Sequence, residues 1–541
     1  MNNVITFDQT IKSKSMKKII GLFILLYMYC SVYGQVENIR VNSYSLTRCN
    51  EPSIAVNPTN PANIVIGANN TFCFYTFNSG ETWQELQMES SFGVWGDPSL
   101  GFDSEGNLYF THLSGEPPIS GRWADRIVIQ KSIDGGKTWS DGTFTGLNRP
   151  KQEDKSWMTI ADTNSIYKDN IYIAWTEFDT IMSEHPDCKS RILFSYSVDK
   201  GEAWTAPISI NDSDGDCYDD DDTVEGAIPA IGKDGGIYIS WSGPDGILFD
   251  KSLDGGKTFG EDLFISPQIG GWAWDSHEIE GVRGNGFPQT LSDNGISEHS
   301  GNLYIVWADQ RNGTSNTDIF IKKSTDKGIT WNDAVRVNTD MTERPQFFPW
   351  ASIDPETGKL YILFYDRRNT TGTFTDVYLA ISEDGGETFS NIKISEESFS
   401  NDNYAFTGDY INLQVFNGVI YPVWTHVNNL NQRFIYSAVI TEEVLTSTDK
   451  EIGSFENILH TNYPNPFKEE TTISFQVKEK NHVSLRVYDS LGKEVASLVN
   501  EIKKPGEYNV YFDGSNLSSG SFFYKLEVGN WSTSSKMLLL K

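Results

Sequence analysis

A short motif that recurs six times constrains the fold of this chain more than any other feature. The segment SIDGGKTW begins at Ser132, and the other copies begin at Ser197, Ser252, Ser324, Ser382 and, in a degenerate form (TFNSGETW), at Thr76. The copies are roughly 55–70 residues apart, which suits a four-stranded unit repeated around an axis. Each unit must bury its faces against its neighbours, so we expect the repeats to form one continuous structure.

Each repeat contains short apolar segments in the same order. A first segment such as DPSLGFD is followed by IYIAWTEF-like and RILFSYS-like segments, the latter running into the motif, and then by a short fourth such as AVRVN. β-Branched and aromatic residues bounded by Gly, Asn and Asp are typical of strands. With 38% apolar and 13% aromatic residues, the chain can bury a large core. These features predict an all-β fold, and specifically a β-propeller.

The recurring motif has the chemistry of a hairpin turn. Asp134 can accept hydrogen bonds from nearby backbone N–H groups, and the glycines permit a positive φ angle. Trp139, at the end of the motif, is expected to pack between neighbouring sheets. We therefore predict that the motif fastens each sheet and has no catalytic role.

The pattern Ser-x-Asp-x-Gly-x-Thr-Trp resembles the Asp-box, or bacterial neuraminidase (BNR) repeat, of sialidase-like propellers. The resemblance covers residues 35–440 and implies a propeller over that range. In such enzymes the box lies on the face opposite the active site, and it also occurs in propellers without enzymatic activity. The resemblance therefore bears on the fold more than on any activity.

The number of blades depends on how the two ends of the propeller meet. A seventh set of strands begins with GDYINLQV at Gly408, but neither the motif nor an obvious fourth strand follows it. The segment ENIRVN, from Glu37 to Asn42, resembles the fourth strand DAVRVN that begins at Asp333. We predict that this N-terminal segment completes the last blade, which gives seven blades. Six blades, as in authentic sialidases, is the alternative.

The N-terminus predicts export. A basic segment, KSKSMKK, precedes the apolar run IIGLFILLYMY, and Val32 and Gly34 are the small residues that a signal peptidase requires. Residues 1–34 are therefore expected to be a removed signal peptide. No later run approaches the ~20 apolar residues of a membrane span, and a formal net charge of −30 argues against a nucleic-acid partner.

The cysteines also suggest an oxidising compartment. Four remain after the signal peptide, an even number. The pairing with the shortest loops joins Cys49 to Cys73 and Cys188 to Cys217. We predict these two disulfides, with buried free thiols as the alternative.

The composition changes after residue 440. A linker is expected over residues 441–455, and residues 456–541 are predicted to form a small antiparallel β-sandwich. Through Pro464-Asn465-Pro466-Phe467, Tyr488-Asp489 and the strand at Gly520, this tail resembles the C-terminal sorting domain of the type IX secretion system of Bacteroidetes-like bacteria. The resemblance implies interaction with that machinery, passage through the periplasm, and a secreted or outer-membrane cell-surface location.

One acidic residue stands near the start of the first strand in five of the blades. The first strands of a propeller line its central channel, so these carboxylates could form a negatively charged rim that binds Ca²⁺ or a cationic ligand. The alternative is that each acid caps its own strand and bonds the backbone of the next blade. The residues are Glu51, Asp97, Asp154, Glu225 and Asp409.

Arginines occur in the loops where a sialidase would bind its substrate. Sialidases hold the sugar carboxylate with three arginines, protonate with an Asp, and attack with a Tyr that a Glu supports. The resemblance makes Tyr365, with Asp366 beside it, the candidate nucleophile. The Arg-Ile-Pro motif of the first arginine is absent, and an acidic rim opposes an anionic substrate, so structural pairing of each arginine with a neighbouring acid is the alternative. The arginines that follow second strands are Arg311, Arg367 and Arg368, and those that precede first strands are Arg48, Arg149, Arg283 and Arg344.

An acidic insertion, NDSDGDCYDDDD, occupies residues 211–222 and does not repeat elsewhere. Alternating carboxylates around a glycine are the oxygen-rich arrangement that a flexible Ca²⁺ loop needs, although the spacing is not that of an EF-hand. We predict Ca²⁺ as a cofactor here, with a merely solvated loop as the alternative. The proposed ligands are Asp212, Asp214, Asp216, Asp219 and Asp220.

Two functions remain open from the sequence. The first is a secreted, sialidase-like propeller that binds or hydrolyses glycans, with retaining glycoside hydrolysis as its chemistry if it is an enzyme. The second is a non-catalytic adhesion or scaffold propeller that binds a glycan or a cell-surface glycoprotein. Three arginines converging beside a Tyr–Glu pair would favour the enzyme, and arginines scattered among the blades would oppose it.

Overall fold

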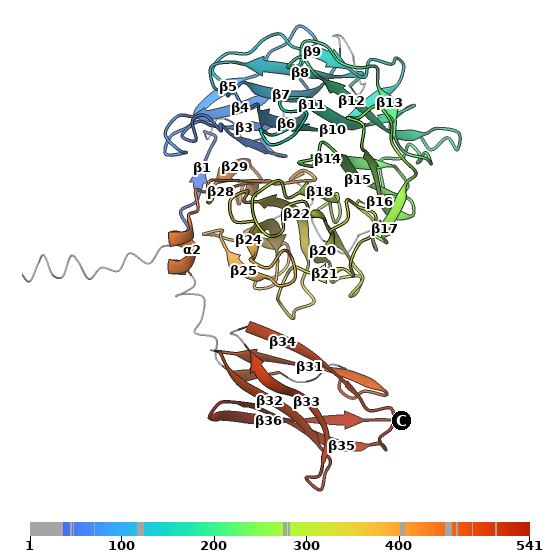
Figure 1. The fold of residues 1–541 in the computed structure, drawn as a ribbon, viewed down its shortest axis with the longest axis vertical. Helices are drawn as coiled ribbons and strands as arrows, with labels where there is room; N and C mark the ends of the chain where they lie inside the picture. The colour runs from blue at the N-terminus through green and yellow to red at the C-terminus, as the bar shows by residue number, and fades with distance from the viewer. Residues whose placement is uncertain are drawn as a thin grey trace, which may run out of the picture. The chain divides into compact units, whose positions relative to one another are not determined.

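The computed structural model describes residues 36–43, 46, 48–69, 71–115, 124–273, 279, 282–400, 406–448, 457–460, 462, 464–478, 480–503 and 506–541. It divides the chain into two compact units, Val36–Glu442 and a second that includes Glu443–Lys541 (Figure 1). The predicted signal peptide, residues 1–34, lies outside the described residues. Among those residues, no helix has the length and apolar character needed to cross a membrane.

The described part of Val36–Glu442 folds into seven antiparallel sheets. The first contains β2 (Ser53–Val56), β3 (Ile64–Ala68), β4 (Phe72–Thr76) and β5 (Gln84–Gln87). The second contains β6 (Gly96–Phe102), β7 (Leu108–Ser114), β8 (Arg126–Ser132) and β9 (Thr143–Thr145). The third contains β10 (Gln152–Ile160), β11 (Ile171–Phe178), β12 (Ser190–Ser197) and β13 (Ile208–Ser209).

The remaining four sheets repeat this order. The fourth contains β14 (Glu225–Ile231), β15 (Ile237–Gly243), β16 (Gly246–Ser252) and β17 (Leu263–Ser266), and the fifth β18 (Gln289–Ser292), β19 (Leu303–Asp309), β20 (Asp318–Ser324) and β21 (Val335–Arg336). The sixth contains β22 (Gln346–Ile353), β23 (Leu360–Asp366), β24 (Phe374–Ser382) and β25 (Ser390–Lys393), with β26 (Phe399–Ser400) also paired to β24. The seventh contains β27 (Asn412–Phe416), β28 (Val419–Val427), β29 (Arg433–Ser437) and β1 (Ile39–Arg40).

The first strands of successive sheets form a closed circle, so this unit is an all-β propeller. Each first strand contacts the next, from β2 through β6, β10, β14, β18, β22 and β27, and β27 contacts β2 again. A cavity of about 330 Å³ lies along the axis, and all seven of these strands contribute to its lining. The circle is closed where the last sheet contacts the first, although these two sheets are far apart in sequence.

The N-terminal segment is the outermost strand of the last sheet, as predicted. Ile39 pairs with Ser437 in an antiparallel ladder, and the backbone N–H of Val41 donates to the carbonyl of Ile435 at 2.8 Å. The two ends of this unit are therefore held in one sheet. The outer edge of the last sheet is then a strand of only two residues, and such a short edge offers little to pair with another chain.

The middle strands are buried on both faces because each sheet packs between two others. All eight residues of β11 are buried, which explains why such segments are continuous apolar runs and do not alternate. Trp175, Trp241, Trp307 and Trp424 stand on second strands of four sheets, and all four side chains are fully buried. These large side chains fill the space between adjacent sheets.

The recurring hairpins are fastened by the aspartate that the sequence singled out. The carboxylate of Asp254 accepts from the backbone N–H groups of Lys257 and Thr258, both at 3.0 Å, and from the hydroxyl of Thr258 at 2.7 Å. In the second hairpin, Trp139 packs into the cluster between the first two sheets, as predicted. In the first hairpin, Asn78 stands at the aspartate position and accepts from the Thr82 N–H at 3.1 Å.

One of the two predicted disulfides forms and the other does not. Cys188 and Cys217 are bonded, which confirms that pair. Cys49 and Cys73 are free and buried, so the prediction for them is wrong. The physical reason is that they face opposite sides of the first sheet: Cys49 packs in the cluster shared with the last sheet, and Cys73 in the cluster shared with the second.

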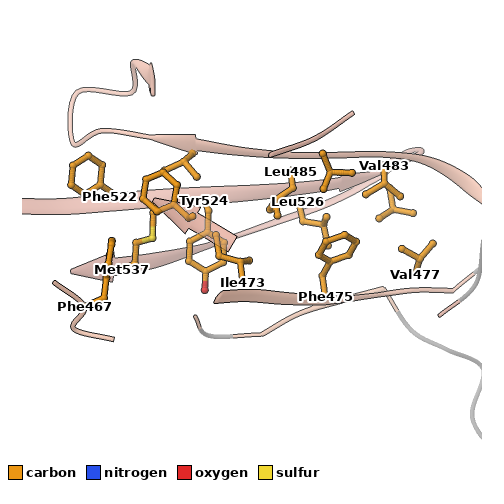
Figure 2. Packing of buried hydrophobic residues seen from close by; sticks show 14 of the residues in the cluster. Phe467, Ile473, Phe475, Val477, Val483, Leu485, Phe522, Tyr524, Leu526 and Met537 are labelled. Carbon is orange, nitrogen blue, oxygen red and sulfur yellow. The ribbon is translucent and has the colours of Figure 1, made fainter. Parts of the chain in front are cut away.

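The second unit is a small β-sandwich. One sheet contains β30 (Ile458–Leu459), β31 (Glu470–Val477) and β34 (Gly506–Asp513), and the other β33 (Glu494–Lys503), β32 (Asn481–Tyr488), β35 (Gly520–Val528) and β36 (Trp531–Leu539). Figure 2 shows Ile473 and Phe475 of β31 facing Leu485, Tyr524 and Leu526 of the second sheet. A short helix, α2 (Glu442–Thr448), lies within the stretch that the sequence predicted to be a linker.

Candidate functional site at one mouth of the central channel

The five acidic residues of the predicted rim gather at one end of the channel. Glu51 precedes β2, Asp97, Asp154 and Glu225 lie in β6, β10 and β14, and Asp409 precedes β27. Each is at most 6% exposed. Because the recurring hairpins follow the ends of third strands, and neighbouring strands are antiparallel, the acids and the hairpins lie on opposite faces of the propeller.

A lysine that the sequence reasoning missed lies among these acids. The Nζ of Lys155 is 2.8 Å from Oδ2 of Asp409, and 3.6 Å from both Oε1 of Glu51 and Oδ2 of Asp97. Lys155 is 5% exposed, so these ion pairs are shielded from water. The position next to Asp154 at the start of a first strand was the available sequence signal.

The first strands carry local irregularities that turn these side chains inward. The pairing of β10 with β11 shifts register between Asp154 and Trp157, and Lys155 has a φ of 49°. Glu51 and Asp97, at the corresponding places in their blades, have φ values of 51°. Left-handed conformations are costly for residues with a side chain, so the surrounding sheets must hold this backbone in place.

Arg283 and Asp219 complete the cluster. The guanidinium of Arg283 pairs with Oδ1 of Asp219 at 2.5 Å and with Oδ2 of Asp409 at 3.0 Å, and it lies over the ring of Trp272 at 4.6 Å. Asp219 was predicted as a ligand in the acidic insertion, but it points into the channel mouth instead. We call the eight residues the acidic cluster: Glu51, Asp97, Asp154, Lys155, Asp219, Glu225, Arg283 and Asp409.

Three of these carboxylates approach one another closely. Asp154, Asp219 and Glu225 each place an oxygen within 4.8 Å of the other two, and all three residues are buried. Oε2 of Glu225 accepts from the hydroxyl of Thr223 at 3.1 Å. Oε1 of Glu225 has no hydrogen-bond partner among the described residues.

Burial and charge push the pKa values of the cluster apart. Burial raises the pKa of Glu51 to about 8 against the attraction of Lys155, and it holds the pKa values of Asp154 and Glu225 well above their usual range. Burial also disfavours the charged form of Asp409, but the charges of Arg283 and Lys155 outweigh it and lower the pKa of Asp409. The cluster therefore contains both a readily ionised carboxyl and carboxyls that resist ionisation.

An aromatic layer separates the acidic cluster from the axial cavity. The ring of Trp157 lies 4.7 Å from that of Trp350 and 4.6 Å from that of Tyr410. Trp157 and Trp350 also line the cavity. The acids thus face the mouth of the channel, and the cavity beneath is bounded by aromatic rings and by short polar and apolar side chains of the first strands.

Tyr365 is not placed to act as a nucleophile. Its side chain is 1% exposed, and its hydroxyl donates to the carbonyl of Thr425 at 2.8 Å and accepts from the N–H of the same residue at 3.1 Å. Burial raises the pKa of the phenol far above its usual value. The hydroxyl joins the sixth sheet to the seventh, so the catalytic prediction for Tyr365 is replaced by a structural role.

The arginines that follow second strands bind acids and hydroxyls close to them. Arg311 binds Asp309 of its own sheet at 2.9 Å and the hydroxyl of Ser266 at 2.9 Å. Arg368 binds Asp366 at 2.7 Å, where burial raises the pKa of the carboxyl to about 6. These two arginines belong to different sheets and have different partners, which opposes the predicted catalytic clamp.

The other candidate arginines are also dispersed. Arg367 is 2% exposed, donates to the hydroxyl of Thr375 at 3.0 Å and lies over the ring of Phe347. Arg344 donates to the carbonyl of Gly372 at 2.6 Å. Two further candidates pair with acids in different places: Arg149 binds Asp125, and Arg283 joins the acidic cluster. The backbone of Arg48 forms a bridge to Arg433.

The predicted Ca²⁺ ligands of the acidic insertion separate into four groups. The carboxylate of Asp212 accepts from the backbone N–H of Asp262 at 2.7 Å, and the N–H of Asp212 donates to the carboxylate of Asp262 at 2.8 Å. Asp214 lies 3.2 Å from the guanidinium of Arg191. Asp219 belongs to the acidic cluster. The remaining two, Asp216 and Asp220, come together with Asp222, which the sequence reasoning left out.

The fold and this site define an all-β propeller with a buried acidic cluster at one mouth of its channel, followed by a β-sandwich tail. Residues 461–540 match the family described as the secretion system C-terminal sorting domain. The tail is thus a sorting domain of the type IX system, and it implies secretion to the cell surface or beyond. No curated protein matches the chain in sequence.

Solved structures of similar shape are distant in sequence. A protein of unknown function from Dyadobacter fermentans is 12% identical, with 75% of this chain and 98% of that chain covered and a TM-score of 0.43. A polysaccharide lyase, a PL25 ulvan lyase, is 13% identical over 76% and 99% of the chains with a TM-score of 0.44. The sialidase of Trypanosoma rangeli is 12% identical over 87% of each chain with a TM-score of 0.41. At these values the similarities carry no inference about activity.

Proposed function

We propose that this protein is an exported propeller that binds a glycan on the face that carries the acidic cluster. The observation that carries the proposal is a set of exposed aromatic side chains on loops that lead into first strands. Trp95, directly before β6, is 43% exposed, Tyr218, in the loop before β14, is 39% exposed, and Phe406, before β27, is 48% exposed. Exposed rings on loops at this face are suited to contact with a ligand.

The chemistry of these loops fits a carbohydrate. Aromatic rings offer flat apolar surfaces to the C–H faces of sugars, and a few polar groups nearby fix the orientation of a ligand. Tyr218 lies in the acidic insertion, which the Cys188–Cys217 disulfide anchors. An anchored loop loses less conformational entropy when it binds a ligand.

Binding without sialidase chemistry is the form of this function that the site supports best. Tyr365 is buried and bonded to the backbone of Thr425, and Arg311 and Arg368 are paired with local aspartates. The set of residues that a sialidase needs is therefore not assembled in the described part of the chain. One observation supports a hydrolase: the pKa of Glu225 is raised and that of Asp409 is lowered, as in a general acid and base pair. Both groups are buried, which opposes their direct contact with a substrate.

The test is a binding measurement on the exported protein with sialylated, uronic-acid-containing and neutral oligosaccharides. For the class that binds, Trp95→Ala and Phe406→Ala are expected to weaken binding roughly 3- to 10-fold, because an aromatic contact contributes about 0.5–1.5 kcal/mol. Ile133→Ala is the matched control, since Ile133 is 78% exposed but lies on a recurring hairpin at the opposite face. Equal binding by all three variants would overturn the assignment of the face. Release of free sugar would favour the hydrolase.

A further inference from the structure

Three buried carboxylates from separate segments meet at the edge of the acidic cluster. Asp154 comes from β10 of the third sheet, Glu225 from β14 of the fourth, and Asp219 from the insertion between them. Their oxygen atoms all lie within 4.8 Å of one another. The three residues are 5%, 0% and 7% exposed, so bulk water cannot screen their mutual repulsion.

A second, independent observation points to a missing positive charge. Oε1 of Glu225 is buried and has no hydrogen-bond partner among the described residues. Buried carboxylate oxygens are normally hydrogen-bonded or bound to a cation. The neighbouring Oδ1 of Asp409 is in the same condition.

The charge balance of the cluster leads to the same conclusion. Within the described residues, six carboxylates surround two cationic side chains, Lys155 and Arg283. Lys155 pairs with Glu51, Asp97 and Asp409, and Arg283 divides between Asp219 and Asp409, so both cations also serve carboxylates outside the three-carboxylate group.

We propose that Asp154, Asp219 and Glu225 bind a divalent cation, and that Ca²⁺ is the cation that fits them. Two oxygens bound to one Ca²⁺ at about 2.4 Å are at most about 4.8 Å apart, and the oxygens of this group lie within that limit. The donors are all oxygen atoms, as hard cations require, and Ca²⁺ tolerates the irregular geometry of a site built from three segments. Waters or backbone carbonyls complete its coordination.

The bound cation cross-links the third and fourth sheets to the acidic insertion. Asp219 lies two residues after Cys217, so the Cys188–Cys217 disulfide holds this ligand's segment against the residues just before β12. The trio of Asp216, Asp220 and Asp222 in the same insertion is more exposed. The N–H groups of Tyr218 and Asp222 already bond to Asp216 and Asp220. We therefore assign the cation to the buried group.

The experiment is calorimetric titration of the chelator-treated, full exported protein with CaCl₂, together with its melting temperature with and without Ca²⁺. We expect saturable binding and a rise in melting temperature, because a ligand that binds the native state alone stabilises it. Glu225→Gln keeps the size of the side chain and removes its charge, and it should weaken Ca²⁺ binding at least tenfold. Its melting temperature without Ca²⁺ should equal or exceed that of the wild type, which shows that the variant folds.

Asp222→Asn is the matched control in the exposed trio, and it should bind Ca²⁺ like the wild type. Loss of binding in Asp222→Asn with normal binding in Glu225→Gln would overturn the proposal and place the cation in the exposed trio. Absence of saturable binding up to about 5 mM CaCl₂, a few times the dissociation constant of the weakest extracellular sites, would also overturn it. No sugar enters these measurements, so their failure is distinguishable from failure of the proposed glycan binding.

Discussion

The ammonium group of Lys155 lies 2.8 Å from Oδ2 of Asp409, and these two residues are 254 positions apart in the chain. The pair joins the third sheet to the loop that begins the seventh, across the mouth of the channel. A single buried cation thus connects distant blades. Carboxylates outnumber cations at this mouth, so the ammonium both joins the two blades and offsets the repulsion between the carboxylates.

Removal of this ammonium is expected to destabilise the propeller strongly. Lys155→Met keeps the length of the side chain but leaves Asp409, Glu51 and Asp97 buried without their nearest cation. Breaking a buried ion pair in this way costs about 3–5 kcal/mol in the free energy of unfolding, measurable by urea denaturation. Lys200→Met is the control, because its pair with Glu105 lies at the surface. A loss below about 1 kcal/mol for Lys155→Met would contradict this role.

The recurring hairpins should depend on hydrogen bonding more than on charge. Asp254→Ala removes the acceptor for Lys257 and Thr258, and we expect a loss of about 1 kcal/mol in the free energy of unfolding. Asp254→Asn should lose less, because Asn78 already serves at the same position of the first hairpin. Urea denaturation of both variants checks this expectation. Equal losses would show that the negative charge is the essential feature.

The cysteines predict a definite labelling pattern. Cys49 and Cys73 are buried thiols, and burial raises the pKa of Cys49 to about 12, so iodoacetamide should label no thiol in the native exported protein. Unfolding without reductant should expose two labelled cysteines, identified by peptide mass spectrometry. Labelling of Cys188 or Cys217 under that condition would contradict the disulfide.

The disulfide itself should stabilise the acidic insertion. Its cysteines are separated by 29 positions, and closure of a loop of that size contributes about 3–4 kcal/mol in the chain-entropy description. The Cys188→Ser and Cys217→Ser double variant should lose stability of that order in urea denaturation. A double variant as stable as the wild type would show that the insertion is held by its other contacts.

His112 should make the stability of the propeller pH-dependent. Burial lowers the pKa of His112 to about 4 from an ordinary value of 6.5. The unfolded chain therefore binds a proton first as the pH falls, so the contribution of His112 is fully present above pH 6.5 and is lost toward pH 4. The loss is about 3 kcal/mol. Between pH 4.5 and 7, the free energy of unfolding of His112→Gln should change less with pH than that of the wild type. The same substitution at the exposed His185 should leave the pH dependence of the wild type unchanged.

Much of the propeller could be predicted because its signals are local and repeated. The hairpin of Asp254 bonds to residues three and four positions away, and alternation and apolar runs mark each strand within its own segment. The closing strand was predictable because Ile39 lies in a segment that resembles another fourth strand. The acids were recognised as a group because they occupy similar places in successive repeats.

The errors arose where the outcome depends on which side of a sheet a residue faces. Cys49 and Cys73 are close in sequence but pack into clusters on opposite faces of the first sheet. Tyr365 lies at the end of a second strand, yet its hydroxyl turns toward Thr425 of the next sheet. Spacing along the chain does not report these directions, because small register shifts rotate side chains from one face to another.

The sequence by itself determined the repeated strands, the hairpins, the closing segment and the sorting tail, because each is encoded by residues that are neighbours along the chain or recur at a regular interval. The tertiary structure alone decided that Lys155, Arg283 and Asp219 meet the acids at the channel mouth. Their meeting requires the ring to close and the first strands to bulge, and the resulting burial sets the electrostatics of the cluster. The closure comes from contacts between residues that are hundreds of positions apart, such as Ile39 and Ser437.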